Sequence, residues 1–506
     1  MARGDDTSAS MSPSTPLLAR LPVIIIGAGI SGLLLAQHLR QQGIPFRIFE
    51  RDADMNSRGV GWGLTLNWSL PMLKSLVSPE LLSRLPETYV DRQGIASGVA
   101  PRFPFYDLST GELKATTPPL PETVRVRVTR ERLRKWLATD IDVEWNKTFK
   151  SFIEASNVCS HSAAIEYQDY GSNAVTVTFD DGSTCHGSLL VACDGSNSRV
   201  RRALFPRLAM ENLYRLPIAV MGVKMQLSTA QIAGMRACDA YFLQGTSSKD
   251  DSFVYMSVLD APGNSPENPP DMYNLQICLS WLYRDGCLGR GKQVGIPETQ
   301  EDRRKLFLEF AASYAEPFCS VMGAITNDTE VRSVDLSDWP PPKGLHTTGN
   351  VVLMGDSLHP MAMFPRKTFG IHSREQHRGE GANHAIADVA DFAKHVVPLL
   401  GANNRASSVA GSGSETGQLG SENWPAEKDA EEEGAENGFM LCRNRLRRAL
   451  DQYEEIVVNR ARPGVLASRR ACMDAHEWAR IGPESPLLTK RQMNIVYDEA
   501  ADRIMV

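Results

Sequence analysis

The sequence predicts an α/β protein in which a parallel sheet flanked by helices is interrupted by a second domain rich in β-strands. Residues 22–50 follow the order strand, glycine-rich turn, helix, strand. Two later stretches, 189–195 and 350–356, each combine a buried strand with an acidic residue beside a glycine, and residues 239–283 hold three further strand-like stretches. Strands that alternate with helices favour a parallel sheet, whereas a run of strands favours a separate sheet.

The composition excludes several classes of protein. The 506 residues are 42% hydrophobic and 23% charged, and the net charge is −6, as in a globular protein without a nucleic-acid-binding surface. Nine dispersed cysteines without a C-x-x-C pair indicate reduced thiols. Residues 1–20 lack the apolar core of a secretory signal, and no stretch reaches the roughly 18 apolar residues of a membrane span. We therefore expect a cytoplasmic protein.

A glycine-rich motif follows the first strand, the apolar run Val23–Ile26. It has the form G-x-G-x-x-G, at Gly27, Gly29 and Gly32, and it opens a helix that ends near Gly43. The glycines allow a tight turn, the approach of backbone to a pyrophosphate, and close packing of the helix on the strand. The helix N-terminus offers free N–H groups to the phosphates. This order predicts a Rossmann-type dinucleotide site, whereas the bare glycine pattern could belong to an ordinary turn.

Acidic residues end the other strands of the predicted sheet. Glu50 follows the second strand, where its carboxylate can accept a hydrogen bond from a ribose hydroxyl, which disfavours NADP as the tightly bound ligand. Asp194–Gly195 and Gly355–Asp356 follow two later strands. Ligands of α/β proteins bind at this carboxyl edge of the sheet.

The motifs together resemble the single-component FAD-dependent aromatic hydroxylases of the p-hydroxybenzoate and salicylate hydroxylase type, and most of all the fungal FAD-dependent monooxygenases of secondary metabolism. The resemblance implies a Rossmann-like FAD-binding domain with an inserted β-sheet substrate domain and C-terminal helices. The matching stretches are GAGISG (27–32), Glu50, R-x-x-L (130–133), ACDGSNSRVR (192–201), GDSLHPM (355–361) and RGEGANHAIADVADFAKHV (378–396).

This layout divides the chain into six parts. They are a disordered segment (1–20), the first part of the FAD-binding domain (21–204, with substrate-side elements near 60–120), the substrate domain (205–345), the second part of the FAD-binding domain (346–400), a low-complexity loop (401–438) and C-terminal helices (439–506). We expect a monomer or a homodimer.

The resemblance also implies roles for single residues. Glu50 would bind the adenosine ribose, Arg130 would lie by the FAD phosphates, and Asp356 would hold the ribityl hydroxyls. Asp194 and Gly195 would lie where the pyrophosphate meets a visiting NADPH. The residues expected to bind the cofactor are Gly27, Gly29, Ile30, Ser31, Gly32, Glu50, Arg51, Arg130, Asp194, Gly195, Gly355, Asp356, Pro360, Gly379, Gly381, Ala382 and Asn383.

The stretch from Gly379 suits a flat ring on physical grounds. Gly379, Gly381 and Ala382 have little or no side chain, so backbone can approach the flavin. The helix that begins near Asn383 would direct its N-terminus at the ring edge that is anionic in reduced flavin. By resemblance, backbone around Pro360 supports the activated oxygen.

The implied reaction is a monooxygenation. NADPH or NADH reduces the tightly bound FAD, O₂ adds to give a C4a-hydroperoxide, and one oxygen atom passes to an aromatic, polyketide-like or alkaloid-like substrate. An FAD-dependent oxidase or dehydrogenase is the alternative, whereas a halogenase is disfavoured because no W-x-W-x-I-P stretch occurs.

The sequence does not identify a catalytic base. Tyr214, Arg215, Tyr241 and Tyr255 are candidates in the expected substrate domain, although each has the features of a packing or surface residue. No metal site is expected, since the histidines cluster without the spacing of ligands on rigid elements.

Residues 365–377 separate two halves of what is one loop in the family. They are unspliced intron sequence, a surface excursion, or an insertion that impairs FAD binding and leaves a pseudoenzyme. We favour the first of these hypotheses.

Overall fold

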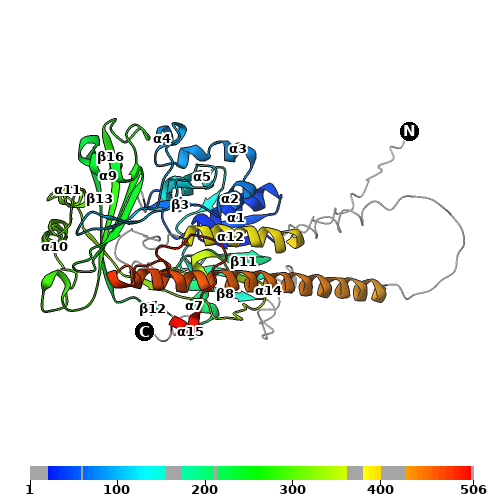
Figure 1. The fold of residues 1–506 in the computed structure, drawn as a ribbon. Coiled ribbons are helices and arrows are strands. Elements are labelled where there is room, and N and C mark those ends of the chain that lie inside the picture. The colour runs from blue at the N-terminus through cyan, green and yellow to red at the C-terminus, as the bar shows by residue number, and fades with distance from the viewer. Residues whose placement is uncertain are drawn as a thin grey trace, which may run out of the picture.

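The computed structural model describes residues 21–57, 61–154, 174–208, 213–361, 380–400 and 428–502. The segment 1–20, the insert 365–377 and Gly379 therefore lie outside the described residues. Two lobes are visible in Figure 1. The cofactor lobe is built on a five-stranded parallel sheet, and the sheet lobe, at the left of the view, is built on a seven-stranded, mainly antiparallel sheet.

The parallel sheet has the strand order β19-β11-β1-β2-β7, and each neighbouring pair is parallel. Its strands are β1 (Val23–Ile26), β2 (Phe46–Phe49), β7 (Val143–Glu144), β11 (Leu189–Ala192) and β19 (Val351–Leu353). Their carboxyl ends meet at one edge of the sheet. Gly27, Glu50, Asp194 and Gly355 closely follow four of these ends, as the sequence predicted.

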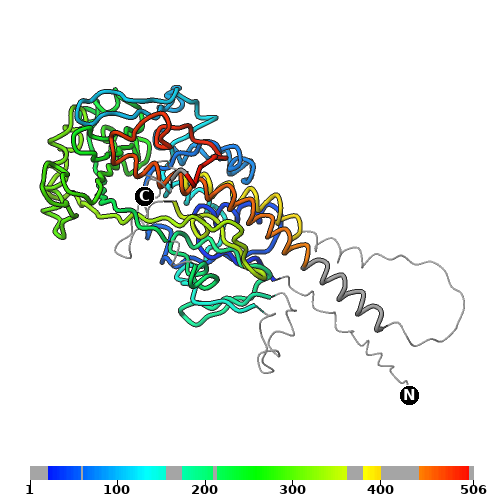
Figure 2. The backbone as a smooth tube through the Cα atoms, turned by 60° about the horizontal axis from the view of Figure 1, so that its bottom comes forward, coloured from blue at the N-terminus to red at the C-terminus, as the bar shows by residue number. Residues whose placement is uncertain are grey.

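Three long helices of the cofactor lobe lie beside one another. They are α1 (Ile30–Gln41), α12 (Gly381–His395) and α14 (Lys428–Asp474). Helices α12 and α14 run side by side in Figures 1 and 2, and Phe392 of α12 contacts Tyr453 of α14 with ring centroids 5.5 Å apart. Within the described ranges, none of the helices is both long and apolar enough to cross a membrane.

Helix α14 differs from the sequence prediction. It begins at Lys428, inside the stretch 401–438 that we expected to be a loop, and continues past the predicted helix near 439–460 to Asp474. The loop prediction is therefore wrong for residues 428–438, and residues 401–427 lie outside the described residues. The stretch is poor in apolar residues but rich in alanine and glutamate, which are strong helix formers.

The sheet lobe has the strand order β17-β13-β16-β15-β14-β4-β5. Its strands are β4 (Phe105–Asp107), β5 (Leu113–Ala115), β13 (Ile218–Ser228), β14 (Phe242–Thr246), β15 (Phe253–Asp260), β16 (Met272–Leu282) and β17 (Arg332–Val334). The three stretches predicted as strands match β14, β15 and β16. The single helix predicted over 295–318 is instead two, α10 (Gln300–Ala312) and α11 (Phe318–Gly323), because Pro317 disfavours helix before it.

The two faces of this sheet have different neighbours. Residues such as Ile277 and Trp281 of β16 point to an apolar face covered by α10, α11 and α9 (Thr229–Cys238). On it, Trp281 contacts Phe310 of α10 with ring centroids 4.9 Å apart. The opposite face meets the cofactor lobe, where Gln276 Oε1 accepts a hydrogen bond of 3.0 Å from the Gly63 N–H.

Candidate functional site

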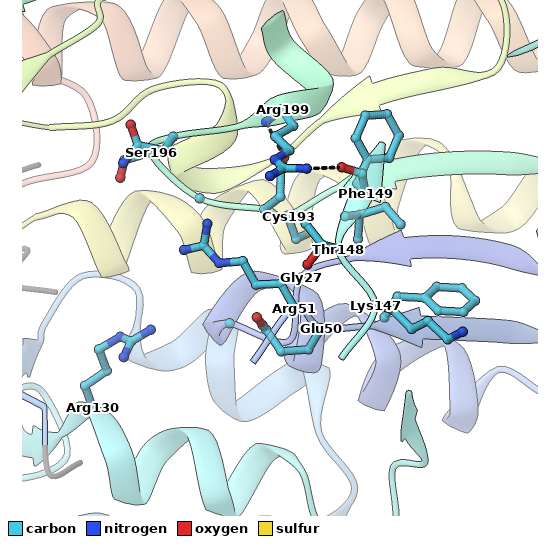
Figure 3. Close-up of a pocket in the computed structure, with 16 residues that line it drawn as sticks. Gly27, Glu50, Arg51, Arg130, Lys147, Thr148, Phe149, Cys193, Ser196 and Arg199 are labelled. Atoms are coloured by element: carbon cyan, nitrogen blue, oxygen red, sulfur yellow. Dashed lines mark hydrogen bonds between the residues drawn. The ribbon is translucent and has the colours of Figure 1, made fainter. Parts of the chain in front are cut away.

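A cleft opens at the carboxyl edge of the parallel sheet (Figure 3). Its empty volume is about 670 Å³, part of it open to solvent. It is lined by loops after β1, β2 and β11 and by helix α5 (Arg130–Leu137), so stretches far apart in the sequence converge there. The sequence-predicted cofactor residues in its lining are Gly27, Gly29, Glu50, Arg51, Arg130, Asp194 and Gly195.

The glycine-rich turn leaves space for a ligand at one point only. Gly27 has φ +106°, and a Cβ there would lie 2.3 Å from the carbonyl oxygen of Cys193. A Cβ on Gly32 would lie 2.0 Å from the carbonyl oxygen of Gly27, so only glycine lets α1 pack this closely. A Cβ on Gly29 would meet nothing within 4 Å. Gly27 and Gly32 are thus required by the fold, whereas the open side of Gly29 faces the cleft.

Helix α1 begins at this open side. Its N-cap is Gly29, no side chain caps it, and its first turn contains no acidic residue. The predicted residues Ile30 and Ser31 form the start of this turn and are buried. The N–H groups and the positive end of the helix dipole are therefore presented to the cleft, an arrangement suited to a phosphate.

Glu50 is fixed in the cleft by several hydrogen bonds. Its Oε2 accepts from the Ala28 N–H at 2.9 Å, and its Oε1 accepts from the Asp52 N–H at 3.2 Å. Arg134 Nη2 lies 3.6 Å from the carboxylate, and only 4% of Glu50 is exposed. The carboxylate is thus oriented beside the cleft, as needed to accept from a sugar hydroxyl.

Helix α5 carries three arginines with separate partners. Arg130 lines the cleft on the side away from Lys147 (Figure 3). Arg134, which sequence reasoning missed, donates from Nε to the Ala28 carbonyl at 2.7 Å and so ties the helix to the glycine-rich turn. Arg132 pairs with Asp260 of β15 at 2.5 Å. Helical periodicity placed Arg134 one turn after Arg130, but its partners lie about a hundred positions away in the chain.

Two of the basic side chains at the cleft already have partners. Lys147 Nζ donates to Asp181 at 2.7 Å, and Arg199 Nη1 donates to the Phe149 carbonyl at 2.9 Å (Figure 3). Arg51, in contrast, is exposed and makes no hydrogen bond or ion pair in the part of the chain that the structure describes. Its guanidinium is available to an anionic ligand.

Asp194 has one oxygen engaged and one without a partner. Its Oδ2 accepts from the N–H groups of Arg199 at 2.7 Å and Val200 at 3.3 Å, and so caps helix α7 (Arg199–Leu204). Its Oδ1 is buried with no hydrogen-bond partner among the described residues. Burial raises the pKa of this carboxyl group, although the bonds from Ser198 and the helix N–H groups oppose it. Gly195, with φ +80°, turns the chain at the rim.

Gly355, Asp356 and Pro360 lie next to the cleft rather than in its lining. Gly355 and Asp356 form a short 3₁₀ turn, Gly355–Ser357, after β19. The Asp356 carbonyl accepts from Arg201 at 3.3 Å, and Arg201 lies close enough to Asp194 for their charges to interact. The Pro360 carbonyl accepts from the Trp339 N–H at 3.2 Å. Asp194 and Asp356 are therefore linked through one buried arginine.

The side chain of Asn383 is engaged with protein. Its Oδ1 accepts from the Asn67 N–H at 3.0 Å and the Ser69 hydroxyl at 2.8 Å, and its Nδ2 donates to the Thr65 carbonyl at 3.0 Å. Gly381 and Ala382 form the first turn of α12 and are buried. Asn383 therefore fixes the position of this turn, and only backbone of the turn remains for a ligand.

The four candidate bases lie in different places. Tyr255 lies near Arg127, whose guanidinium carbon is 5.9 Å from the centre of its ring, on the face toward the cofactor lobe. Tyr241 lies on the helical side near Arg236, and burial raises the pKa of its phenol. Tyr214 and Arg215 form the short strand β12 (Tyr214–Arg215). In it, Tyr214 lies under the Arg469 guanidinium, 4.0 Å from the ring centre, and Arg215 is exposed.

Arg127 joins the two lobes, and sequence reasoning did not select it. It is 2% exposed, donates to Thr65 Oγ1 at 2.8 Å, and donates to Ser257 Oγ of β15 at 3.0 Å. Trp62 packs beside Gly222 of β13 at the same seam. The pattern R-V-R-V-T-R gave no signal that its middle arginine points into another sheet.

One cluster has the composition of a metal site. The ligand atoms of His346, Asp451 and Glu454 lie within 4.8 Å of one another. Arg447, however, donates to Asp451 at 3.0 Å and to Glu454 at 2.9 Å. Its guanidinium already binds both carboxylates, so the cluster carries no metal assignment.

Comparison with known proteins identifies the cofactor and the family. Residues 20–250 match the family model described as "FAD binding domain". A protein of Arthroderma benhamiae named "Probable FAD-dependent monooxygenase" is 37% identical over 478 residues, which cover 93% of this chain and 95% of that protein. The chain belongs to the family of FAD-dependent monooxygenases. A second relative, the FAD-dependent monooxygenase dbaB of Emericella nidulans, is 33% identical over 380 residues, covering 74% of this chain and 87% of the relative.

This monooxygenase shares its fold with a flavoprotein of known structure. HpxO of Klebsiella pneumoniae, solved in complex with FAD and uric acid, superposes with a TM-score of 0.59 at 17% identity, covering 93% of this chain and 91% of HpxO. At this identity the likeness concerns the fold alone. The predicted family, Rossmann-like fold class and FAD cofactor are confirmed.

The cleft of the monooxygenase also fits FAD on structural grounds. The open side of Gly29 at the N-terminus of α1 suits a pyrophosphate, and Arg51 has no partner within the described ranges. Glu50 is oriented to accept a hydrogen bond, as a ribose requires. The orphaned Oδ1 of Asp194 is a buried acceptor on the same cleft.

Proposed function

We propose that this monooxygenase uses NAD(P)H to reduce its FAD and transfers one atom of O₂ to an aromatic, polyketide-like or alkaloid-like small molecule of fungal secondary metabolism. The observation that carries the proposal is the convergence of Gly29, Glu50 and Asp194 on one cleft in a chain of this family. FAD, when bound, accepts a hydride from NAD(P)H and activates O₂ at its C4a position.

The proposed roles of the cleft residues follow from their contacts. The N-terminus of α1 and the guanidinium of Arg51 bind the pyrophosphate, and Arg130 lies along the same phosphates. Glu50 accepts from the adenosine ribose. Asp356, on the turn that Arg201 holds, faces the ribityl chain. Apart from Arg51, each role uses a group that the fold already holds in place.

We place the substrate between the flavin and the face of the sheet lobe that meets the cofactor lobe. Gln276 and Ser257 lie on this face, and both are hydrogen-bonded to the cofactor lobe, which fixes the distance between the lobes. Among the four candidate bases, Tyr255 alone was found on this face, so it is our candidate for contact with a phenolic substrate. The reaction requires that water be kept out of this site.

Isotope tracing tests the proposal. The purified holoenzyme is supplied with NADPH or NADH and a panel of phenols and polyketides under ¹⁸O₂, and the products are analysed by mass spectrometry. We expect one ¹⁸O atom in the product and consumption of one reduced nicotinamide per turnover. Product that lacks ¹⁸O, formed with H₂O₂, would show an oxidase or dehydrogenase instead. A purified protein that does not take up FAD would show a pseudoenzyme.

A further inference from the structure

Two parts of the proposed flavin seat lie on either side of residues 362–379 in the chain. The first part is the turn Gly355–Ser357, in the described segment that ends at Met361. The second part is helix α12, which begins at Gly381, just after Glu380. Met361 and Glu380, the described residues on either side, are both buried. Contacts between described residues on the two sides join the two parts.

Asp388 of α12 makes these contacts. Its Oδ2 accepts from the Gly355 N–H at 2.7 Å and lies 2.7 Å from His359 Nε2. Both Asp388 and His359 are completely buried. One carboxylate oxygen of α12 therefore contacts both the Gly355 backbone and the His359 side chain, which precede residues 362–379 in the chain. A Cβ on Gly355, whose φ is +65°, would lie 3.4 Å from the Cβ of Ala385, so the turn also packs directly on α12.

The second oxygen of Asp388 is held by α14. Arg460 Nη2 donates to Asp388 Oδ1 at 2.9 Å and to Asp391 at 2.8 Å. Burial alone would raise the pKa of Asp388, but His359, Arg460 and the Gly355 N–H outweigh it and hold the pKa near 2. The carboxylate is thus charged at any working pH, and it is compensated by partners on both sides.

The N-terminus of α12 has its own anchors on the far side. Asn383 makes the three bonds to residues 65–69 described above, and Glu380 accepts from Trp68 Nε1 at 3.2 Å. Neither anchor involves the Gly355 turn. Asp388 therefore supplies a polar link between this turn and the helix.

We infer that Asp388 is a positioning residue: it holds the Gly355–Asp356 turn against α12, so that both form one flavin seat with or without the insert 365–377. The inference rests on the proposed roles of the turn and of α12 in binding FAD. It also means that the insert 365–377 does not by itself abolish cofactor binding.

Titration of apoprotein with FAD tests this inference without using turnover. The variants are Asp388→Asn, which removes the charge but keeps the volume, Asp391→Asn, which also removes a charge that faces Arg460 but does not touch the turn, and a chain lacking 365–377. We expect Asp388→Asn to weaken FAD binding at least tenfold and to change the shape of the bound flavin's visible band at saturation. We expect the other two to remain within about threefold of wild type.

The outcomes separate positioning from general stability. Circular dichroism and thermal unfolding of each apoprotein establish that the variants fold. A folded Asp388→Asn protein with wild-type affinity and spectrum overturns the inference, as does a deletion that weakens FAD binding as much as Asp388→Asn. Wild-type protein that binds FAD but forms no oxygenated product contradicts the proposed function and leaves this inference standing. Wild-type apoprotein that never binds FAD overturns both.

Discussion

The three glycines of the G-x-G-x-x-G motif are required for different reasons. Gly27 and Gly32 are required by contacts within the protein, since a Cβ on either would lie within 2.3 Å of a backbone oxygen. Gly29 has no such neighbour, and its negative φ suits any residue. The motif therefore combines two requirements of the fold with one that only a bound ligand imposes.

Alanine substitutions separate these requirements. Gly27→Ala should lower the free energy of unfolding by about 3 kcal/mol, because it adds a clash to a strained φ. Gly29→Ala should leave the apoprotein within about 0.5 kcal/mol of wild type but weaken FAD binding at least tenfold. Urea unfolding and FAD titration measure the two effects. Gly43→Ala, with φ +65° and no atom within 4 Å, is the control for strain alone and should cost about 1 kcal/mol. Wild-type FAD affinity in Gly29→Ala would refute the assigned role of that glycine.

Glu50 offers a second test on a single side chain. Glu50→Gln keeps the size but removes the charge that faces Arg134 and one acceptor of a backbone N–H. We expect FAD affinity to fall about tenfold, which corresponds to about 1.4 kcal/mol. Glu144→Gln, which disrupts an exposed pair with Arg47, is the matched control and should bind FAD as wild type does. Equal affinities of the two variants would show that Glu50 does not contact the cofactor.

Side-chain orientation marks the limit of what the sequence predicts at these positions. Asp194 lines the cleft, but one of its oxygens caps α7. Asn383 was expected at the flavin, yet its amide is occupied by residues 65–69. Such partners come from segments that are distant in the chain, so no local pattern signals them. The same holds for Arg134 and Asp388, whose functions depend entirely on tertiary contacts.

Among the elements, those with strong local patterns were predictable and those defined by packing were not. The buried strands β1 and β11 and the strands β14–β16 follow apolar patterns in the sequence. Helix α14 was underestimated because its first part is polar, and periodicity cannot identify a helix without an apolar face. The division between α10 and α11 depends on one proline.

The chain just after α14 is joined to the sheet lobe by a buried histidine, which makes this junction sensitive to acid. His476 Nδ1 lies 2.7 Å from the Cys472 carbonyl, and Nε2 lies 2.8 Å from Ser280 Oγ of β16. Burial lowers the pKa of His476 to about 4, which outweighs the opposing bond to Cys472. The neutral ring therefore donates from Nδ1 and accepts at Nε2.

Stability should fall as the pH drops below the ordinary histidine range. The unfolded chain takes up a proton near pH 6.5, whereas the folded protein resists until about pH 4, so the stabilisation is present above pH 6.5 and is lost between these values. From pH 7 to pH 5 this residue should account for a loss of about 2 kcal/mol. Urea unfolding at both pH values, compared with His476→Gln, measures it. An unchanged pH dependence in His476→Gln would contradict the assignment.

At the scale of the whole molecule, we expect the contact between the two lobes to control how efficiently NAD(P)H is used. Gln276 and Ser257 of the sheet lobe are hydrogen-bonded to Gly63 and Arg127 of the cofactor lobe. The proposed substrate position lies along this seam. Water that enters there would divert activated oxygen to H₂O₂, so tight contact between the lobes should decide how efficiently NAD(P)H is used.

Loosening the seam should uncouple the reaction. Arg127→Met removes the bonds to Thr65 and Ser257 but leaves the lining of the cleft intact. We expect FAD affinity within about threefold of wild type and a several-fold rise in H₂O₂ formed per nicotinamide oxidised. Arg125→Met is the matched control: Arg125 is also buried but donates to the carbonyls of Pro101 and Pro118 rather than across the seam. Equal H₂O₂ yields from both variants would show that Arg127 has no special part in excluding water.

The link through Asp388 has a consequence for how the length of the chain can change at the insert 365–377. Here hydrogen bonds, rather than the connecting chain, set the distance between two parts of the proposed binding site. An insertion or deletion in the connecting chain then need not weaken binding. The insert 365–377 lies between the two parts that Asp388 joins. Related proteins can therefore differ in length there while keeping the same cofactor, and a frame-preserving gain of sequence at this point can persist.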